Sequence, residues 1–165
     1  MNHLVPDDGQ LSITASETWQ RLRDALLDVA CTPFSSPAVV QERLLRTDAE
    51  ALGIDRVSLW LFEAGKDAIV CTALYEAGKG LSKPGTRIAA EVAPSYFQSL
   101  QGLLTLAAED ARRDPRTREF EQSYLGPLGI GAMLDVPVRL FGEMVGLLCH
   151  EHVGGPRHWS DAERI

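Results

Sequence analysis

The chain has 165 residues, which is the size of one domain and too short for two independent hydrophobic cores. Its composition, 45% hydrophobic and 24% charged, is typical of a globular protein, and its net charge of -7 without a cluster of Lys and Arg argues against binding to nucleic acid. No apolar run is long enough to cross a bilayer and the first fifteen residues lack a basic leader region, so we expect a soluble, cytoplasmic protein without a membrane segment.

Two amphipathic helices are predicted at the start of the chain, after a flexible leader over residues 1–13. Thr14 and Glu17 form a capping-box pattern for the first helix. Its apolar face carries Trp19, Leu22, Leu26, Val29 and Ala30. The second helix begins at Ser36-Pro37 and ends at Gly53, a favourable residue after a helix. We expect the folded domain to span residues 14–165.

Strand patterns follow the second helix. Residues 56–63 and 68–75 are rich in β-branched and aromatic side chains and are joined by a turn-forming segment, so we expect an antiparallel hairpin. After a Gly-rich and Pro-rich loop, the sequence predicts a helix over 94–102, a strand over 103–107 and a helix over 117–125.

The last hairpin has the clearest pattern. Residues 132–140 and 143–152 form its strands around Phe141-Gly142, and Ser160 is expected to cap a final helix that the chain end interrupts. This order of elements predicts an α+β fold in which helices cover an antiparallel sheet.

The two faces of this hairpin differ in chemistry. A two-residue turn pairs Leu140 with Glu143 and, by counting back, Asp135 with Leu148 and Met133 with His150. The predicted apolar face consists of Leu134, Val136, Val138, Val145, Leu147 and Cys149. The predicted mixed face consists of Met133, Asp135, Pro137, Leu148, His150 and His152. Asp135 and His150 then either orient a ligand or close a solvated face by a cross-strand hydrogen bond.

Chemical motifs of enzymes are missing from the sequence. His150-Glu151-His152 is a weak metal pattern, because a third ligand would have to be Cys149 on the opposite face or His158 across a loop. Alternation also turns Cys149 away from His150, which argues against a nucleophile and base pair there. The cysteines, Cys31, Cys71 and Cys149, lie among apolar or small residues, as reduced buried thiols do. No P-loop, dinucleotide fingerprint or hydrolase triad occurs. We therefore predict no catalytic residues and no metal site.

The chain resembles the GAF domain family, through five stretches in the family's order. These are residues 56–62 (Arg-Val-Ser-Leu-Trp-Leu-Phe), 94–97 (Pro-Ser-Tyr-Phe), 109–117, 128–138 and 146–154. The resemblance implies a GAF/PAS-like twisted antiparallel sheet of five or six strands. It also implies terminal helices on one face, and short helices over a ligand pocket on the other. The Glu-His-Val-Gly near the end is most similar to GAF domains of bacterial histidine kinases and diguanylate cyclases.

The ligand is not identified by the resemblance. Family ligands include cyclic nucleotides, tetrapyrroles and metabolites. Members that attach a bilin covalently place a cysteine before the last hairpin, and this chain has none between Cys71 and Cys149. Members that reduce free methionine sulfoxide carry cysteines in the loop over the pocket, and residues 76–87 have none. Cyclic nucleotides receive little support, because the chain is acidic and lacks a Gly-rich helix start that could bind their phosphate.

Candidate pocket walls come from four segments of the chain. They are Trp60, Tyr96, Phe97, Asp110, Phe120, Tyr124, Met133, Asp135 and His150. Core packing is the alternative for each aromatic residue, and a loop or helix cap is the alternative for Asp110. We expect a sensor whose terminal helices pass on the binding of a small molecule and form a parallel homodimer. The output domain would lie in the same polypeptide. The other hypothesis is a dimerisation or protein-interaction module with a collapsed pocket and no small-molecule ligand.

Overall fold

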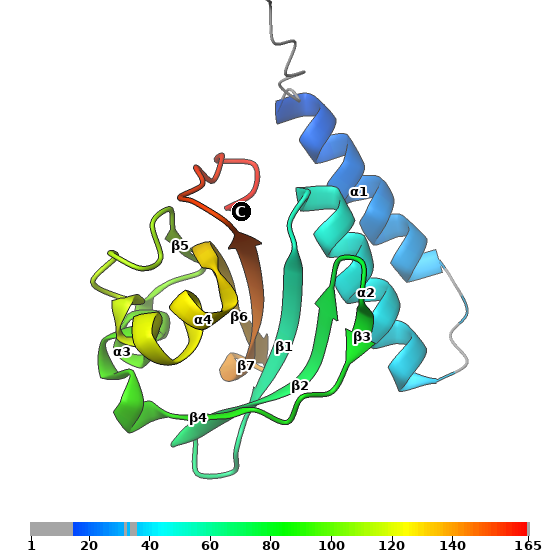
Figure 1. Ribbon diagram of the computed structural model, residues 1–165. Coiled ribbons are helices and arrows are strands. Elements are labelled where there is room, and N and C mark those ends of the chain that lie inside the picture. Colours follow the sequence, from blue (N-terminus) through cyan, green and yellow to red (C-terminus); the bar gives the residue numbers. More distant parts are fainter. Residues whose placement is uncertain (1–14, 32, 34–35, 165) are drawn as a thin grey trace, which may run out of the picture.

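The computed structural model describes residues 15–31, 33 and 36–164, and Figure 1 shows them arranged in layers. The helices α1 (Ala15–Cys31) and α2 (Pro37–Leu52) lie on one side of an antiparallel sheet. Short helices lie on the other side, among them α3 (Pro94–Gly102) and α4 (Gly126–Leu128). The predicted α+β fold is therefore confirmed. None of the helices within the described ranges is long and apolar enough to span a membrane.

The two long helices form a hairpin, of which α2 is the member that packs on the sheet. The side chain of Ser36 accepts a hydrogen bond from the Val39 amide, and Gly53 ends α2 with a φ of 60°, as the sequence predicted. An ion pair between Arg43 and Asp28 joins α2 to α1. The predicted leader, Thr14 and the side chains of Trp19, Leu22, Leu26 and Val29 lie outside the described part.

The sheet has the order β3-β2-β1-β7-β6-β5, with β4 also paired to β2. Its strands are β1 (Arg56–Phe62), β2 (Ala68–Glu76), β3 (Gly80–Ser82), β4 (Arg87–Ala89), β5 (Leu106–Ala108), β6 (Ile130–Leu140) and β7 (Glu143–Val153). Both hairpins that the sequence predicted are present. The short strands β3 and β4 fall in the segment predicted as a loop, where Gly and Pro obscure the strand pattern.

The short helices form a roof over one face of the sheet. The helix α3 has the predicted bounds. The predicted helix over 117–125 is instead a 3-10 turn, η2 (Arg118–Phe120), followed by a π-helix, η3 (Glu121–Leu125), and by α4. We call η2, η3 and α4 together the roof segment. Another 3-10 turn, η1 (Ala90–Val92), precedes α3.

Hydrophobic cores fill both sides of the sheet. On the roof side, Leu100, Leu106 and Leu125 are fully buried. On the side of α2, Leu45 packs with Val57 and Trp159. Trp159 belongs to the segment that precedes the predicted final helix. Residues 161–163 form a turn. Just before it, Ser160 donates hydrogen bonds to the Glu163 carboxylate from both its amide and its hydroxyl.

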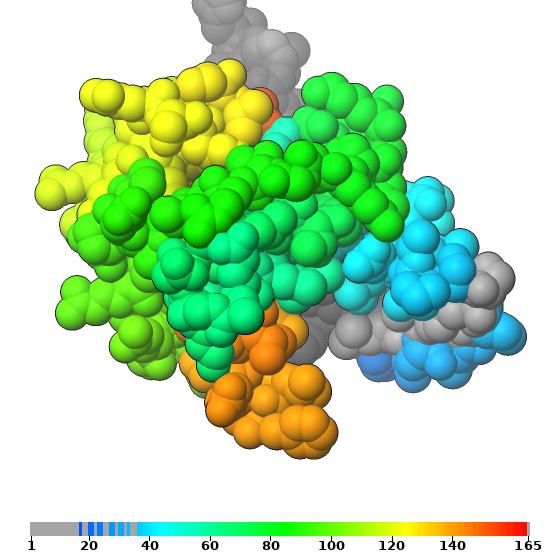
Figure 2. Space-filling model, turned by 90° about the horizontal axis from the view of Figure 1, so that it is seen from below, coloured from blue at the N-terminus to red at the C-terminus, as the bar shows by residue number. Residues whose placement is uncertain are grey.

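A bulge in β7 changes the predicted register of the last hairpin. Leu140 pairs with Glu143 and Arg139 with Met144, as predicted, but Val138 then pairs with Gly146 and not with Val145, so one residue of β7 is skipped. Figure 2 shows the tip of this hairpin (orange) projecting from the molecule. An added Cβ on Gly146 would lie 2.2 Å from the Trp60 carbonyl oxygen, because β7 approaches β1 closely beside the bulge.

The bulge exchanges the two faces of β7, because a shift of one residue turns every following side chain over. Asp135 pairs with Cys149 and not with Leu148, and Met133 pairs with Glu151 and not with His150. The predicted faces of β6 are correct and those of β7 are wrong. Cys149 and Glu151 therefore face the roof, and His150 faces α2.

Candidate functional site

A small cavity lies between the sheet and the roof. Its volume is about 20 Å³, which is room for about one water molecule. The lining residues come from five strands and from three of the short helices. They are Trp60, Ile69, Ile88, Tyr96, Phe120, Tyr124, Met133, Cys149 and Glu151. The walls are thus apolar and aromatic, with one carboxylate.

Aromatic rings occupy most of the space under the roof. Trp60 on β1 meets Tyr124 edge to face, with ring centroids 6.3 Å apart. Tyr96 on α3 meets Phe120 in the same way at 4.9 Å. Such edge-to-face contacts contribute about 0.5 to 1.5 kcal/mol each beyond the burial of the rings. These rings line the cavity from β1, α3, η2 and η3.

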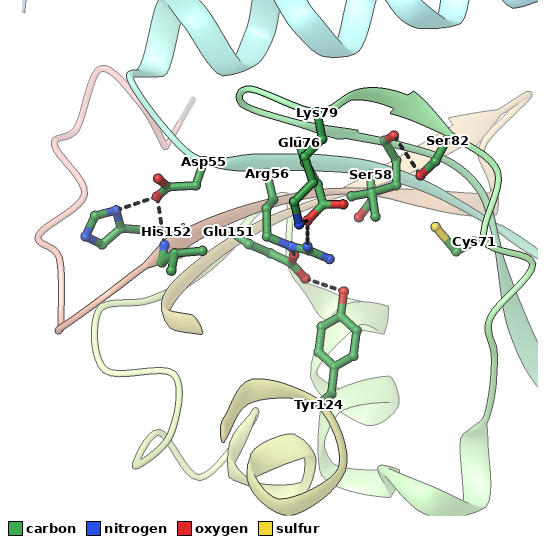
Figure 3. Close-up of polar contacts among 12 residues, drawn as sticks. Asp55, Arg56, Ser58, Cys71, Glu76, Lys79, Ser82, Tyr124, Glu151 and His152 are labelled. Carbon is green, nitrogen blue, oxygen red and sulfur yellow. Dashed lines mark hydrogen bonds and ion pairs between the residues drawn. The ribbon is translucent and has the colours of Figure 1, made fainter. Parts of the chain in front are cut away.

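Glu151 supplies a buried carboxylate to the cavity, and Figure 3 shows its partners. It is 1% exposed and accepts hydrogen bonds from Arg56 Nε and from the Tyr124 hydroxyl, each at 2.8 Å. Arg56 also pairs with Glu76, which Lys79 contacts at the surface. Burial raises the pKa of Glu151, and the neighbouring Arg56 opposes that rise.

Asp135 forms a second buried acid next to the cavity wall. Its Oδ2 accepts a hydrogen bond of 2.7 Å from the Tyr96 hydroxyl, and its fully buried Oδ1 has no partner. Burial raises the pKa of Asp135 to about 7, although the hydrogen bond from Tyr96 acts in the opposite direction. A buried acceptor without a partner costs about 1 to 3 kcal/mol, so Asp135 is primed to accept a hydrogen bond.

The two buried thiols near the cavity are poor nucleophiles. Burial raises the pKa of Cys71 to about 11 and the pKa of Cys149 well above its usual value. Thiolates are the reactive form of cysteine, so both side chains stay protonated and inert at neutral pH. In the described ranges, no three His, Cys, Asp or Glu side chains gather closely enough to hold a metal ion. The arrangement suits binding and not covalent chemistry.

Five of the predicted pocket residues line the cavity together. They are Trp60, Tyr96, Phe120, Tyr124 and Met133. Asp135 lies against this group through Tyr96. Their role in binding a ligand stays a prediction.

Three predicted residues lie elsewhere. Phe97 packs against Phe62 in the core, at 6.1 Å between ring centroids. Asp110 lies on an outer cleft of about 450 Å³, where Arg113 is 3.8 Å from its carboxylate. His150 lies on the opposite face of the sheet, because the bulge in β7 reverses its direction.

Sequence reasoning missed several residues of the site. The unbroken alternation assumed for β7 placed Cys149 on the wrong face, and Glu151 was not named as a site residue. Arg56 was taken only as the start of a strand, and Ile69 and Ile88 lie on strands whose buried faces the sequence did not separate. One indication was available: Gly146 within a strand is a common mark of a bulge or a close backbone approach.

Known proteins share this fold. The GAF domain from an Acinetobacter phosphoenolpyruvate-protein phosphotransferase matches with a TM-score of 0.62 at 18% identity, over 88% of this chain and 82% of that one. The chromophore-binding domain of Stigmatella aurantiaca bacteriophytochrome matches with a TM-score of 0.69 at 15% identity, over 96% of this chain and 59% of that one. The PixJ GAF domain of Thermosynechococcus elongatus matches with a TM-score of 0.60 at 23% identity, over 88% and 79%.

These identities establish a common fold and no common ligand. A search of curated proteins by sequence finds no match. The family model of the GAF domain matches residues 37–164, which is most of the chain and includes every residue of the cavity. The chain therefore belongs to the GAF domain family, whose members serve as sensory and regulatory modules.

Proposed function

We propose that this domain senses a small molecule that binds between the sheet and the roof. The observation that carries the proposal is the pair of buried carboxylates on one face of β6 and β7, Asp135 and Glu151, under a roof of aromatic rings. A buried acceptor without a partner destabilises a fold by about 1 to 3 kcal/mol, so the unpaired Oδ1 of Asp135 beside a cavity favours a binding role over a purely structural one.

The chemistry of the walls favours a flat ligand with hydrogen-bond donors. Trp60, Tyr96 and Tyr124 provide surfaces for an aromatic or conjugated body. Asp135 Oδ1 has a free acceptor position, and Glu151 has carboxylate oxygens that accept hydrogen bonds. A ligand with amine, amidine or ring N–H groups fits these acceptors better than an anion does.

Binding of such a molecule requires the roof to open, because the cavity of about 20 Å³ holds no more than a water. The roof segment contains a π-helix, a conformation that is rare and frequent at functional sites. Tyr124 on this π-helix is hydrogen-bonded to Glu151, so a ligand that takes over Glu151 also releases the roof. The ligand would thereby select an open state.

We further propose a bacterial signalling protein of the histidine kinase or diguanylate cyclase type, with its output domain in the same polypeptide. The Glu-His-Val-Gly pattern at 151–154 supports this type. The terminal helices would pass on the change, since α2 packs on the sheet and α1 packs on α2. A parallel homodimer through these helices is part of this proposal, and light scattering of the purified chain tests it.

A second candidate function is a dimerisation module without a ligand. The observation that favours it is the small volume of the cavity, which the aromatic rings nearly fill. This candidate predicts that no compound stabilises the domain. It also predicts that loss of the dimer, and not loss of Glu151, abolishes output.

The test is a thermal-shift screen with nucleobases, amines, tetrapyrroles and amino-acid derivatives, followed by calorimetric titration of each hit. A ligand at a hundred times its Kd stabilises the folded state by about 2.7 kcal/mol. We expect Glu151→Gln to weaken binding of a hit at least tenfold. The matched control is Glu63→Gln, which alters an exposed carboxylate paired with Arg87. Equal binding by both variants would place the ligand elsewhere, and the absence of any hit would favour the dimerisation module.

A further inference from the structure

His150 is a buried imidazole with acceptors at both ring nitrogens. It is 3% exposed and lies on the face of the sheet that α2 covers. Its Nδ1 is 2.6 Å from the carbonyl oxygen of Leu134 on β6. Its Nε2 is 2.8 Å from a carboxylate oxygen of Asp48 on α2. The ring thus joins two strands to the helix that packs on them.

These contacts specify the protonation state of the ring. A carbonyl oxygen only accepts, so Nδ1 must carry a proton. A carboxylate also accepts, so Nε2 must carry a proton to bond it. Both contacts are satisfied together only by the imidazolium, whose charge makes each hydrogen bond stronger than a neutral one.

The surroundings of the ring contain acids and no opposing cation among the groups that act on it. Asp48 faces it from α2, Asp135 acts on it from β6, and its neighbour on β1 is the apolar Val57. Burial alone would lower the pKa of His150, but Asp48, the Leu134 carbonyl and Asp135 outweigh burial and raise it.

We propose that His150 gives the domain a second input, the proton, which acts on α2 from the face of the sheet opposite the cavity. The imidazolium fastens α2 to β6 and β7. When pH rises and the ring loses one proton, one of its two hydrogen bonds is lost, and an imidazole lone pair then faces an acceptor. α2 loosens from the sheet, and α1 moves with it because α1 packs along α2.

The sign follows from the direction of the pKa shift. The folded-state pKa of His150 is raised above the ordinary value of 6.5, so the folded state holds the proton more tightly than the unfolded state. The stabilisation by His150 is complete below that ordinary value and disappears as pH rises through the folded-state pKa. The domain is therefore expected to hold α2 firmly while His150 is protonated and to release it as pH rises through the folded-state pKa. This behaviour does not depend on the proposed ligand.

The experiment follows His150 and α2 together in the wild-type chain between pH 5.5 and 9. Nitrogen NMR of the ring reports its protonation, and amide hydrogen exchange of residues 44–52, corrected for the intrinsic effect of pH, reports the attachment of α2. We expect exchange to rise at least on the order of tenfold across the His150 titration, because deprotonation of the ring removes a charge-assisted hydrogen bond.

Variants separate this device from a general effect of pH. Asp48→Asn should raise exchange in α2 at pH 6 and remove the step. His152→Gln is the matched control, since His152 pairs with Asp55 in a partly exposed position, and it should keep the step. A neutral His150 ring at pH 6, or a titration of the ring without a change in α2, would overturn the proposal. Both readouts need only the wild-type chain, so they remain decisive if a variant fails to fold.

Discussion

Tyr124 and Glu151 connect the roof to the sheet through one hydrogen bond of 2.8 Å. Tyr124 lies on the π-helix η3, and Glu151 is fixed from the other side by Arg56 on β1. A movement of η3 away from the sheet has to break or replace this contact. This hydrogen bond therefore bears both on the stability of the domain and on the proposed binding of a ligand.

Tyr124→Phe removes the hydroxyl from this contact and leaves one oxygen of Glu151 buried without that donor. We expect a loss of about 1 to 3 kcal/mol in the free energy of unfolding, measured with urea. The control, Tyr75→Phe, removes a hydroxyl on the α2 side of the sheet and should lower the free energy of unfolding by less. Equal losses in the two variants would mean that the Tyr124 hydroxyl does not hold the roof.

Arg56→Met leaves the Glu151 carboxylate in the core without its cation. Breaking a buried ion pair from one side costs about 3 to 5 kcal/mol. Arg87→Met removes the cation of an exposed pair with Glu63, and such pairs contribute about 0 to 1 kcal/mol. Adding Glu151→Gln to Arg56→Met should recover part of the loss. A double variant less stable than Arg56→Met alone would contradict this account of the pair.

Asp135→Asn should change how stability depends on pH. The pKa of Asp135 is about 7 in the folded state and near 3.8 when exposed, so the wild type loses stability as pH rises between these values. The amide cannot ionise and lacks this loss. The stability of the variant relative to wild type should thus increase between pH 4 and 8, by on the order of 4 kcal/mol. Parallel pH profiles of the two proteins would show that Asp135 ionises as an exposed acid does.

Gly146→Ala tests the bulge that sets the faces of β7. The new methyl group would lie 2.2 Å from the Trp60 carbonyl oxygen, which is backbone and cannot move away alone. We expect a loss of about 3 kcal/mol or more in unfolding free energy. Gly155→Ala has open space around the added methyl group and should change stability by less than about 0.5 kcal/mol. A mild effect at Gly146 would indicate a different register.

The fold was predictable because local rules agree with it along most of the chain. Ser36 and Gly53 delimit α2, and Pro94 opens α3, through backbone preferences that need no tertiary contact. Alternation correctly placed Met133 and Asp135 on the roof side of β6. The resemblance to the GAF family supplied what alternation could not, namely which layer covers which face.

The site was predictable only in part, because a single bulge decides it. The skipped residue in β7 depends on the close approach of Gly146 to Trp60, a contact between strands far apart in the sequence. It moves Glu151 into the site and His150 out of it. The partnership of Arg56 with Glu151 follows from the pairing of β1 with β7, which the order of elements does not specify.

Hydrogen exchange of the wild-type domain, with and without a compound found in the thermal-shift screen, tests the central claim most directly. The account predicts that binding changes exchange in the roof segment, residues 118–128, and along β7 around Glu151. Changes confined to the outer cleft around Asp110 and Arg116 would contradict it, because the ligand would then bind outside the cavity between sheet and roof.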